Sequence, residues 1–234
     1  MSSHVPSPLA SLSRRGLAGA ILLAVAGCAL PVAVSDGSAN PSLFPTSPRA
    51  ADAHMPVRIA LVVPATVSDS TYTGARLHTG AHAVKLPIGR IVDAALQRAL
   101  AAAFAGVQRF DAAPDAAGGF AATVTVVQVE GEYEESLAYL LPLPPMLVPM
   151  PVYEVGLRVG FELRLSGSGG ATMTRSYQSD RLPWRLSLWS LNPAGDTLKG
   201  AVQLAHDAAW QQARQAAQDL ANWLEAERMR PRVL

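Results

Sequence analysis

Residues 152–165 read Val-Tyr-Glu-Val-Gly-Leu-Arg-Val-Gly-Phe-Glu-Leu-Arg-Leu. Apolar side chains alternate in this stretch with charged side chains or glycine, and the charged positions are Glu154, Arg158, Glu162 and Arg164. Alternation with a period of two is typical of a β-strand that packs on one face and is open on the other. The stretch therefore predicts a long strand whose charged face meets water or a partner.

A second strand is predicted directly after the first. Ser166-Gly167-Ser168-Gly169-Gly170 has the composition of a tight turn, and it leads into a strand at about residues 171–181, which completes a hairpin. These glycines fit neither a phosphate-binding loop nor a nucleophile elbow, because Gly-x-Ser-x-Gly is missing and no Lys-Ser/Thr pair follows. Upstream, residues 120–134 are rich in Val and Thr and predict another strand.

The first strand of the domain is predicted at Val57–Val63. Both of its faces are apolar, which favours a central place in a sheet. Pro64 ends this strand, and residues 68–82 are predicted to form a polar loop. A short strand is expected at residues 107–110.

Two segments have the three-and-four spacing of amphipathic helices. The first is Pro87–Phe104, with Gly106 as its expected end. The second runs from about Asp196 to Met229 after a loop at 184–195, and its inner stripe is rich in alanine, which permits close approach to a sheet. Together these elements predict an α+β fold: a two-layer sandwich of a mostly antiparallel sheet of four to five strands with two helices on one face.

Charge and composition limit the classes of function. The 234 residues carry a formal net charge of +1, and half of them are hydrophobic. A nearly neutral chain gives no electrostatic reason to expect a nucleic-acid partner. We also expect no cofactor and no metal, and no disulfide, because the chain has a single cysteine.

That cysteine, Cys28, follows the pattern of an export signal. Ser13-Arg14-Arg15 is followed by an apolar run from Leu17 to Gly27, and the run ends in Val25-Ala26-Gly27-Cys28. The apolar core of about ten residues is shorter than the roughly 20 that a membrane-spanning helix needs. The segment resembles a bacterial lipoprotein signal peptide with Val25–Cys28 as its lipobox.

The resemblance implies cleavage before Cys28 and a lipid anchor on this residue. It divides the chain into a signal peptide (1–27), a lipidated Pro/Ser/Ala-rich tether (28–55) and one domain (56–230). Removal of Arg14 and Arg15 changes the formal charge from +1 to −1. Ala29 follows the cysteine where retention at the inner membrane would call for Asp, so the resemblance implies the outer membrane, with the domain facing the periplasm. The two arginines fit either a twin-arginine route or the ordinary charged start of a signal peptide.

The order of elements also resembles that of small periplasmic-facing lipoproteins. These include the lipopolysaccharide-assembly lipoprotein, the YajG-type lipoproteins and the auxiliary lipoproteins of lipid transporters. The resemblance implies a non-enzymatic binding or accessory subunit for envelope assembly or lipid transport, with the membrane and an envelope protein or lipid as partners.

Leu137–Pro151 is the stretch that best fits a binding role. It holds five prolines and no charge, so we expect a loop that either closes one end of the sandwich or is offered to a lipid, a membrane surface or a partner protein. The candidate partner-binding residues are Leu140, Leu143, Met146, Leu147 and Met150. A second apolar loop is expected around Trp184, Leu186, Leu188, Trp189 and Leu191, either packed under the long helix or anchored at a membrane interface.

Two alternatives from other classes stay open. An envelope hydrolase would need His78, His82 or the carboxylates of residues 130–135 to converge in a cleft. The histidines are more simply exposed loop residues, and the glutamates a solvated strand end. A structural lipoprotein of the cell wall would bind peptidoglycan.

Overall fold

The computed structural model describes residues 32–33, 43–44, 55–73, 84–114, 119–140, 150–187 and 193–229. The strands are β1 (Val32–Ala33), β2 (Met55–Val62), β3 (Tyr72–Thr73), β4 (Val84–Leu86), β5 (Phe104–Phe110), β6 (Ala122–Leu140), β7 (Met150–Gly167), β8 (Thr172–Gln178) and β9 (Leu182–Ser187). The helices are α2 (Ala65–Ser68), α3 (Ile88–Ala103) and α4 (Pro193–Met229).

The main sheet has the strand order β5-β2-β6-β7-β8, and β9 also pairs with β7. β2 is parallel to β5 and to β6, whereas β7 is antiparallel to β6, β8 and β9. The two-layer α+β class is therefore confirmed, and so is the interior position of the first strand. The sheet has six strands rather than four to five. A second, small sheet has the order β1-β4-β3.

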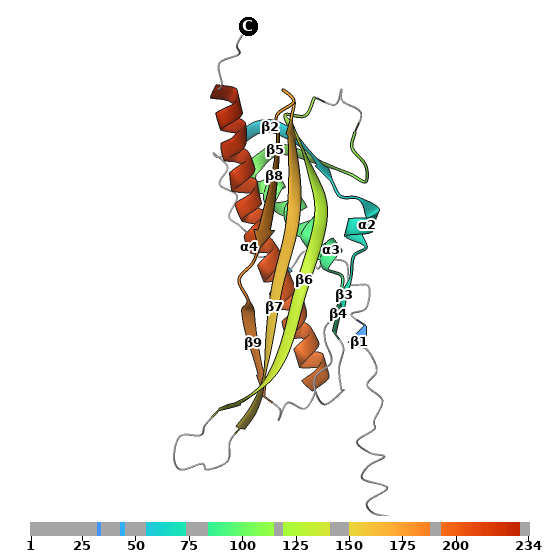
Figure 1. Cartoon of the computed structure of the whole chain (residues 1–234), viewed down its shortest axis with the longest axis vertical. Helices are drawn as coiled ribbons and strands as arrows, with labels where there is room; N and C mark the ends of the chain where they lie inside the picture. Colours follow the sequence, from blue (N-terminus) through green and yellow to red (C-terminus); the bar gives the residue numbers. More distant parts are fainter. Residues whose placement is uncertain are drawn as a thin grey trace, which may run out of the picture.

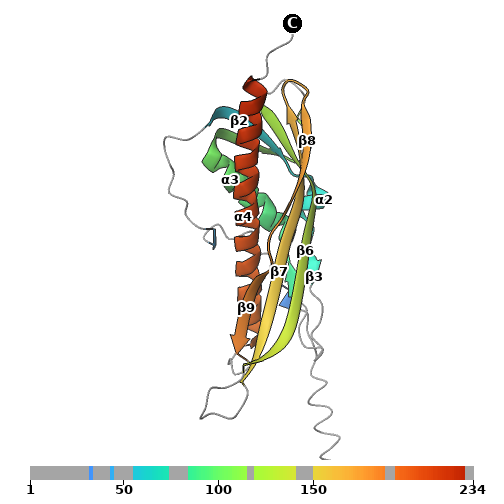
Figure 2. The same cartoon turned by 60° about the vertical axis from the view of Figure 1, so that its left-hand side comes forward.

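Helices α3 and α4 pack against each other on the same side of the main sheet (Figures 1 and 2). The buried positions of α3 repeat at the predicted spacing, and those of α4 are mostly alanines. Small alanine side chains let the helix axis approach the apolar side chains of β7, of which Leu157, Val159 and Leu163 are fully buried. At about 1.5 Å per residue, the 37 residues of α4 extend over roughly 55 Å, so this helix runs along the whole sheet.

The pairing of β6 with β7 is the longest in the fold, from Ala122↔Gly167 to Leu140↔Met150. Its upper half lies between β2 and β8, and β9 is the only described strand that pairs with its lower half. Figure 1 shows the two strands running together to the end of the molecule opposite Met229. We call Leu137–Leu140 with Met150–Tyr153 the hairpin end.

Several predicted boundaries were wrong, each because a tertiary contact overrides local sequence. Gly106 lies inside β5, since α3 already ends at Ala103 and pairing with β2 begins at Phe104. The strand expected at 171–181 ends at Gln178, and a separate strand, β9, begins at Leu182. The described residues of the expected loop at 184–195 belong to β9 and to the start of α4. Ser179 makes this break: its backbone N–H donates to the carbonyl of Val159, and its Oγ accepts from the Val159 N–H, at 2.9 Å each.

The predicted loop at 68–82 also contains structure. Its described part holds the end of α2 and the short strand β3, which brings Tyr72 against β6. The Tyr72 hydroxyl accepts from the backbone N–H of Tyr133 at 3.1 Å and donates to the Tyr133 carbonyl at 3.3 Å. Gly131 makes room for this contact, because a Cβ there would collide with Ile88 and press on the Tyr72 ring. One side chain thus replaces a neighbouring strand at this point of β6.

Removing the hydroxyl tests this replacement. In Tyr72→Phe the partly buried N–H and C=O of Tyr133 lose their partner, and a lost hydrogen bond of this kind costs about 1–2 kcal/mol. We expect the free energy of unfolding, measured by urea denaturation, to fall by that amount with little change in the m-value. Unchanged stability would contradict a structural role for the hydroxyl.

Candidate functional site

The hairpin end holds two of the five candidate binding residues, paired with each other. Leu140 is the last residue of β6 and lies opposite Met150, the first of β7. Leu143, Met146 and Leu147 lie outside the described residues. The prediction of a loop from Leu137 to Pro151 was wrong at both ends, since β6 continues through Leu140 and β7 starts at Met150.

Pro151 explains why a proline-rich segment can still be paired. Pro151 lies opposite Tyr139 in the ladder, and β9 reaches only as far as Val152 on the other side of β7. Proline is tolerated in a strand where its missing N–H would face no neighbour. On the side of Pro151 away from β6, no described strand pairs with it, so the ladder can continue through this residue.

The second predicted apolar loop is largely strand. Trp184 and Leu186 lie in β9, opposite Val155 and Tyr153 of β7, and Leu188, Trp189 and Leu191 lie outside the described residues. A Cβ at Gly200 of α4 would collide with the Trp184 indole. This contact supports packing of Trp184 against the long helix rather than anchoring at a membrane interface. The side chain is still 38% exposed.

The face of the sheet turned away from α3 and α4 is polar, and we call it the outer face. Arg158 of β7 forms an ion pair with Glu132 of β6, with Nη1 to Oε2 at 3.0 Å. The neighbouring Gln128 amide donates to Glu130 at 2.5 Å. Both interactions are exposed to solvent, so they fix side-chain positions and contribute little to stability.

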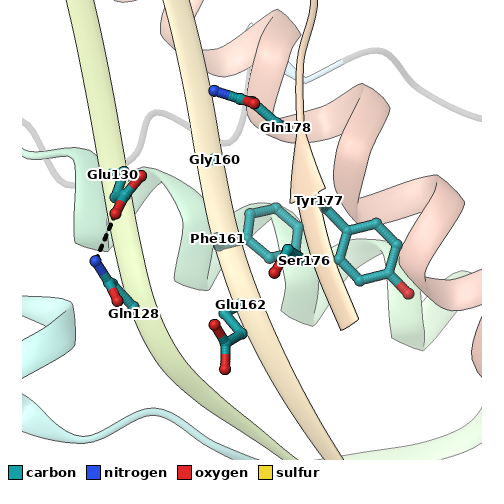
Figure 3. Close-up of a pocket in the computed structure, with 8 residues that line it drawn as sticks. All are labelled: Gln128, Glu130, Gly160, Phe161, Glu162, Ser176, Tyr177 and Gln178. Carbon is teal, nitrogen blue, oxygen red and sulfur yellow. Dashed lines mark hydrogen bonds between the residues drawn. The ribbon is translucent and has the colours of Figure 1, made fainter. Parts of the chain in front are cut away.

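Gly160 opens a shallow hollow in this polar face. The register places Glu130 and Gln178 on either side of Gly160, with Gln128, Glu162 and Ser176 in the next row. Figure 3 shows these side chains around the bare glycine backbone. The hollow has a volume of about 130 Å³, well below the roughly 300–1,000 Å³ of small-molecule sites.

The residues on which a hydrolase would depend are not brought into a cleft where they are described. Glu130 and Glu132 project from an open sheet face, each bonded to a neighbouring polar side chain. His78 and His82 lie outside the described residues. Within the described ranges no three His, Cys, Asp or Glu side chains gather as a metal site would require.

A buried aromatic cluster on α4 was missed by sequence reasoning. Phe44, from the segment predicted to be a tether, is only 3% exposed. Its ring lies 5.0 Å from that of His206 and 6.0 Å from that of Trp210, measured between ring centres. The signal was present, because Phe44 is the only aromatic residue between Cys28 and Met55. This contact attaches the predicted tether to the domain at residue 44.

His206 is enclosed by this cluster. Its Nδ1 donates to the Val202 carbonyl at 2.8 Å, and its Nε2 has no hydrogen-bond partner among the described residues. Burial lowers the pKa of His206 below its usual value of 6.5, because the charged imidazolium would lose its hydration. The neutral ring therefore functions here as part of the apolar core.

A polar contact joins the edge strand β8 to α4. The Tyr177 hydroxyl donates to Asp219 Oδ2 at 3.3 Å, and Arg175 pairs with the same carboxylate. Burial, together with the Asp219 charge, raises the pKa of Tyr177 to about 12. The phenol stays protonated and holds the edge strand against the helix.

None of the described helices is both long and apolar enough to cross a membrane. No protein-family model matches the chain, and no curated protein matches its sequence.

Several solved structures resemble the chain in fold. One is a minor lipoprotein from Acinetobacter baumannii, at 14% identity and a TM-score of 0.36, covering 71% of this chain and 94% of that one. Another is the rare lipoprotein B from Shewanella oneidensis, at 14% identity and a TM-score of 0.38, covering 71% and 98%. A third is a putative neuraminyllactose-binding hemagglutinin homolog from Helicobacter pylori, at 8% identity and a TM-score of 0.41, covering 80% and 97%. At these scores the function must be argued from this chain's own residues.

The buried histidine predicts a specific pH dependence. Because the native pKa of His206 is lowered, its stabilising contribution is present above pH 6.5 and is lost as the pH falls below that value. We expect the free energy of unfolding to fall more steeply between pH 7 and pH 5 in the wild type than in His206→Leu, by up to about 1.4 kcal/mol per pH unit. Urea denaturation at pH 7, 6 and 5 measures this, and parallel curves would show that His206 is not buried in the neutral form.

Proposed function

We propose that this protein is a lipid-anchored envelope protein, attached to the outer membrane through Cys28, with its domain in the periplasm. The domain would act as a non-enzymatic binding or accessory subunit in envelope assembly or lipid transport. Recognition through the hairpin end, rather than chemistry, would be its contribution.

The anchor is supported by the sequence around Cys28. A charged start, a short apolar run and the small residues Ala26-Gly27 directly before the cysteine are the features that lipid attachment requires. Several acyl chains at about 0.8 kcal/mol per buried methylene would make the attachment effectively permanent.

The observation that carries the binding role is the uncharged hairpin end. Residues 136–153 contain no Asp, Glu, Lys, Arg or His. Both strands of the hairpin reach one extremity of the molecule, beside the start of α4 (Figures 1 and 2). An uncharged, apolar segment of this length is typical of a contact surface, because isolated soluble domains rarely expose large apolar patches. The polar outer face of β7, with Arg158, Glu162 and Arg164, is a second surface that a partner could contact.

Loss of Cys28 should leave the protein without its lipid and without processing. In Cys28→Ala neither thioether attachment nor cleavage at the lipobox can occur, so metabolic labelling with a fatty acid should be absent. Because the uncleaved apolar segment can itself hold the chain at the membrane, labelling and the mobility of the processed form are the measurements that decide. A Cys28→Ala protein that is still labelled would contradict the assignment.

Loss of the apolar hairpin should release the partner. We expect Leu140→Ser/Leu143→Ser/Leu147→Ser to abolish capture of an envelope partner by the tagged, full-length protein from gently solubilised envelopes. The replacement removes apolar contact area while leaving the buried ladder upstream of Tyr133 intact.

The matched control changes the same number of residues on the outer face: Arg158→Ser/Glu162→Ser/Arg164→Ser. Circular dichroism and urea denaturation should show both variants folded. Capture that survives the hairpin replacement and fails with the control would place recognition on the outer face and contradict a binding role for the hairpin.

A further inference from the structure

The long strand β6 has an edge that no described strand covers. β2 pairs with β6 only from Ala122 to Thr125, and Tyr72 contacts it at Tyr133. From Glu134 to Leu140, β6 pairs with β7 on one side and with no described strand on the other. Unpaired strand edges are templates for the addition of another strand.

The hydrogen bonds of Tyr72 establish which backbone groups point to this edge. The N–H and C=O of Tyr133 both bond to the Tyr72 hydroxyl, so they point away from β7. Residues two apart in a strand direct these groups to the same side. The N–H and C=O groups of Glu135, Leu137 and Tyr139 therefore also point outward.

A contact across β7 confirms this alternation independently. Val159 lies opposite Gly131, and its N–H and C=O both bond to Ser179, on the far side from β6. Gly131 is thus a non-hydrogen-bonded partner of β7, as the alternation from Tyr133 requires. The same alternation makes Tyr139 a non-hydrogen-bonded partner, a position at which Pro151, which lacks an N–H, costs the β6–β7 ladder no hydrogen bond.

The other edge of the lower sheet is formed by β9, and a proline protects it against strand addition, in contrast to the edge of β6. Pro183 of β9 pairs with Gly156, which pairs in turn with Glu134. By the same alternation the missing N–H of Pro183 belongs on the open side of β9, where a proline discourages strand addition. Residues 126–140 of β6 contain no proline.

Charge favours a partner different from this chain. Residues 134–140, the stretch of β6 that no described strand covers, hold two glutamates, at 134 and 135, and neither Lys nor Arg. A second copy of β6 would bring only carboxylates and uncharged residues to this edge. A strand from another protein can bring a cation to the acidic part and apolar residues to Leu137–Leu140, and such cross-strand pairs stabilise a sheet.

We propose that the open edge of β6, from Glu135 to Tyr139, binds an extended segment of a partner protein as an added β-strand. The segment carries Lys or Arg where it lies beside the glutamates and apolar residues where it lies beside the hairpin end. This proposal rests on the proposed function, because the open edge belongs to the same hairpin to which that function assigns recognition. It adds the mode of binding, which is the addition of a β-strand.

The test uses full-length protein in detergent micelles and a fluorescent nine-residue peptide that alternates valine with threonine and has a lysine at each end. Leu137→Pro removes an outward N–H of β6 without touching its ladder with β7. Arg185→Pro is the matched control. Arg185 lies opposite Glu154 in the ladder, two residues after Pro183, so its backbone N–H also points to the open side of β9. Tyr139→Pro is a second edge variant in case Leu137→Pro does not fold, as judged by circular dichroism.

We expect the wild type and Arg185→Pro to bind the peptide equally, and the edge variants to bind about ten-fold more weakly. Hydrogen exchange in residues 135–140 should slow when the peptide is present. Absence of binding to the wild type, or equal binding by the edge variants, would overturn the proposal. So would a wild-type dimer in solution that Leu137→Pro dissociates and Arg185→Pro does not, since the edge would then hold a second copy.

The peptide measurement needs no envelope component. It therefore tests strand addition at the β6 edge independently of the capture experiment described under the proposed function. Either proposal can fail without the other.

Discussion

The antiparallel pairing of β6 with β7 is the constraint on which the rest of the structure depends. The ladder is longer than any other element except α4, and every other strand of the main sheet joins it or joins β2 beside it. Its upper half is the middle of a six-stranded sheet, whereas its lower half pairs, among the described strands, only with β9. Helix α4 runs along both halves of the ladder (Figure 2), so it joins the upper region and the lower region in one body.

This asymmetry separates stability from recognition. The fully buried side chains gather where α3, α4 and the upper sheet meet, as with Leu61, Leu96 and Leu163. The lower hairpin carries the uncharged sequence and the open edge, and it is removed from that core along the molecule. A surface placed this way can change without loss of the fold, which suits a protein whose proposed role is binding.

The periodic elements could be predicted from the sequence because their side chains report burial directly. Alternation along residues 152–165 and the three-and-four spacing of α3 each gave the correct element and the correct buried face. The short strands β3 and β9 and the burial of Phe44 could not be predicted in this way. Strands β3 and β9 are held by Tyr72 on β6 and by pairing with the lower part of β7, contacts between residues distant in sequence. Phe44 is buried only because α4 offers His206 and Trp210 on one turn.

The sequence by itself determined the α+β class, the faces of the long strand and of both long helices, and the candidate lipid attachment at Cys28. These follow from local patterns, in which each residue's chemistry acts within a few positions along the chain. Only the tertiary structure decided that the proline-rich apolar segment begins and ends inside paired strands, and which edge of β6 is left open. Those features depend on ladder register and on which neighbours are missing, and both are set by strands and side chains far away in the sequence.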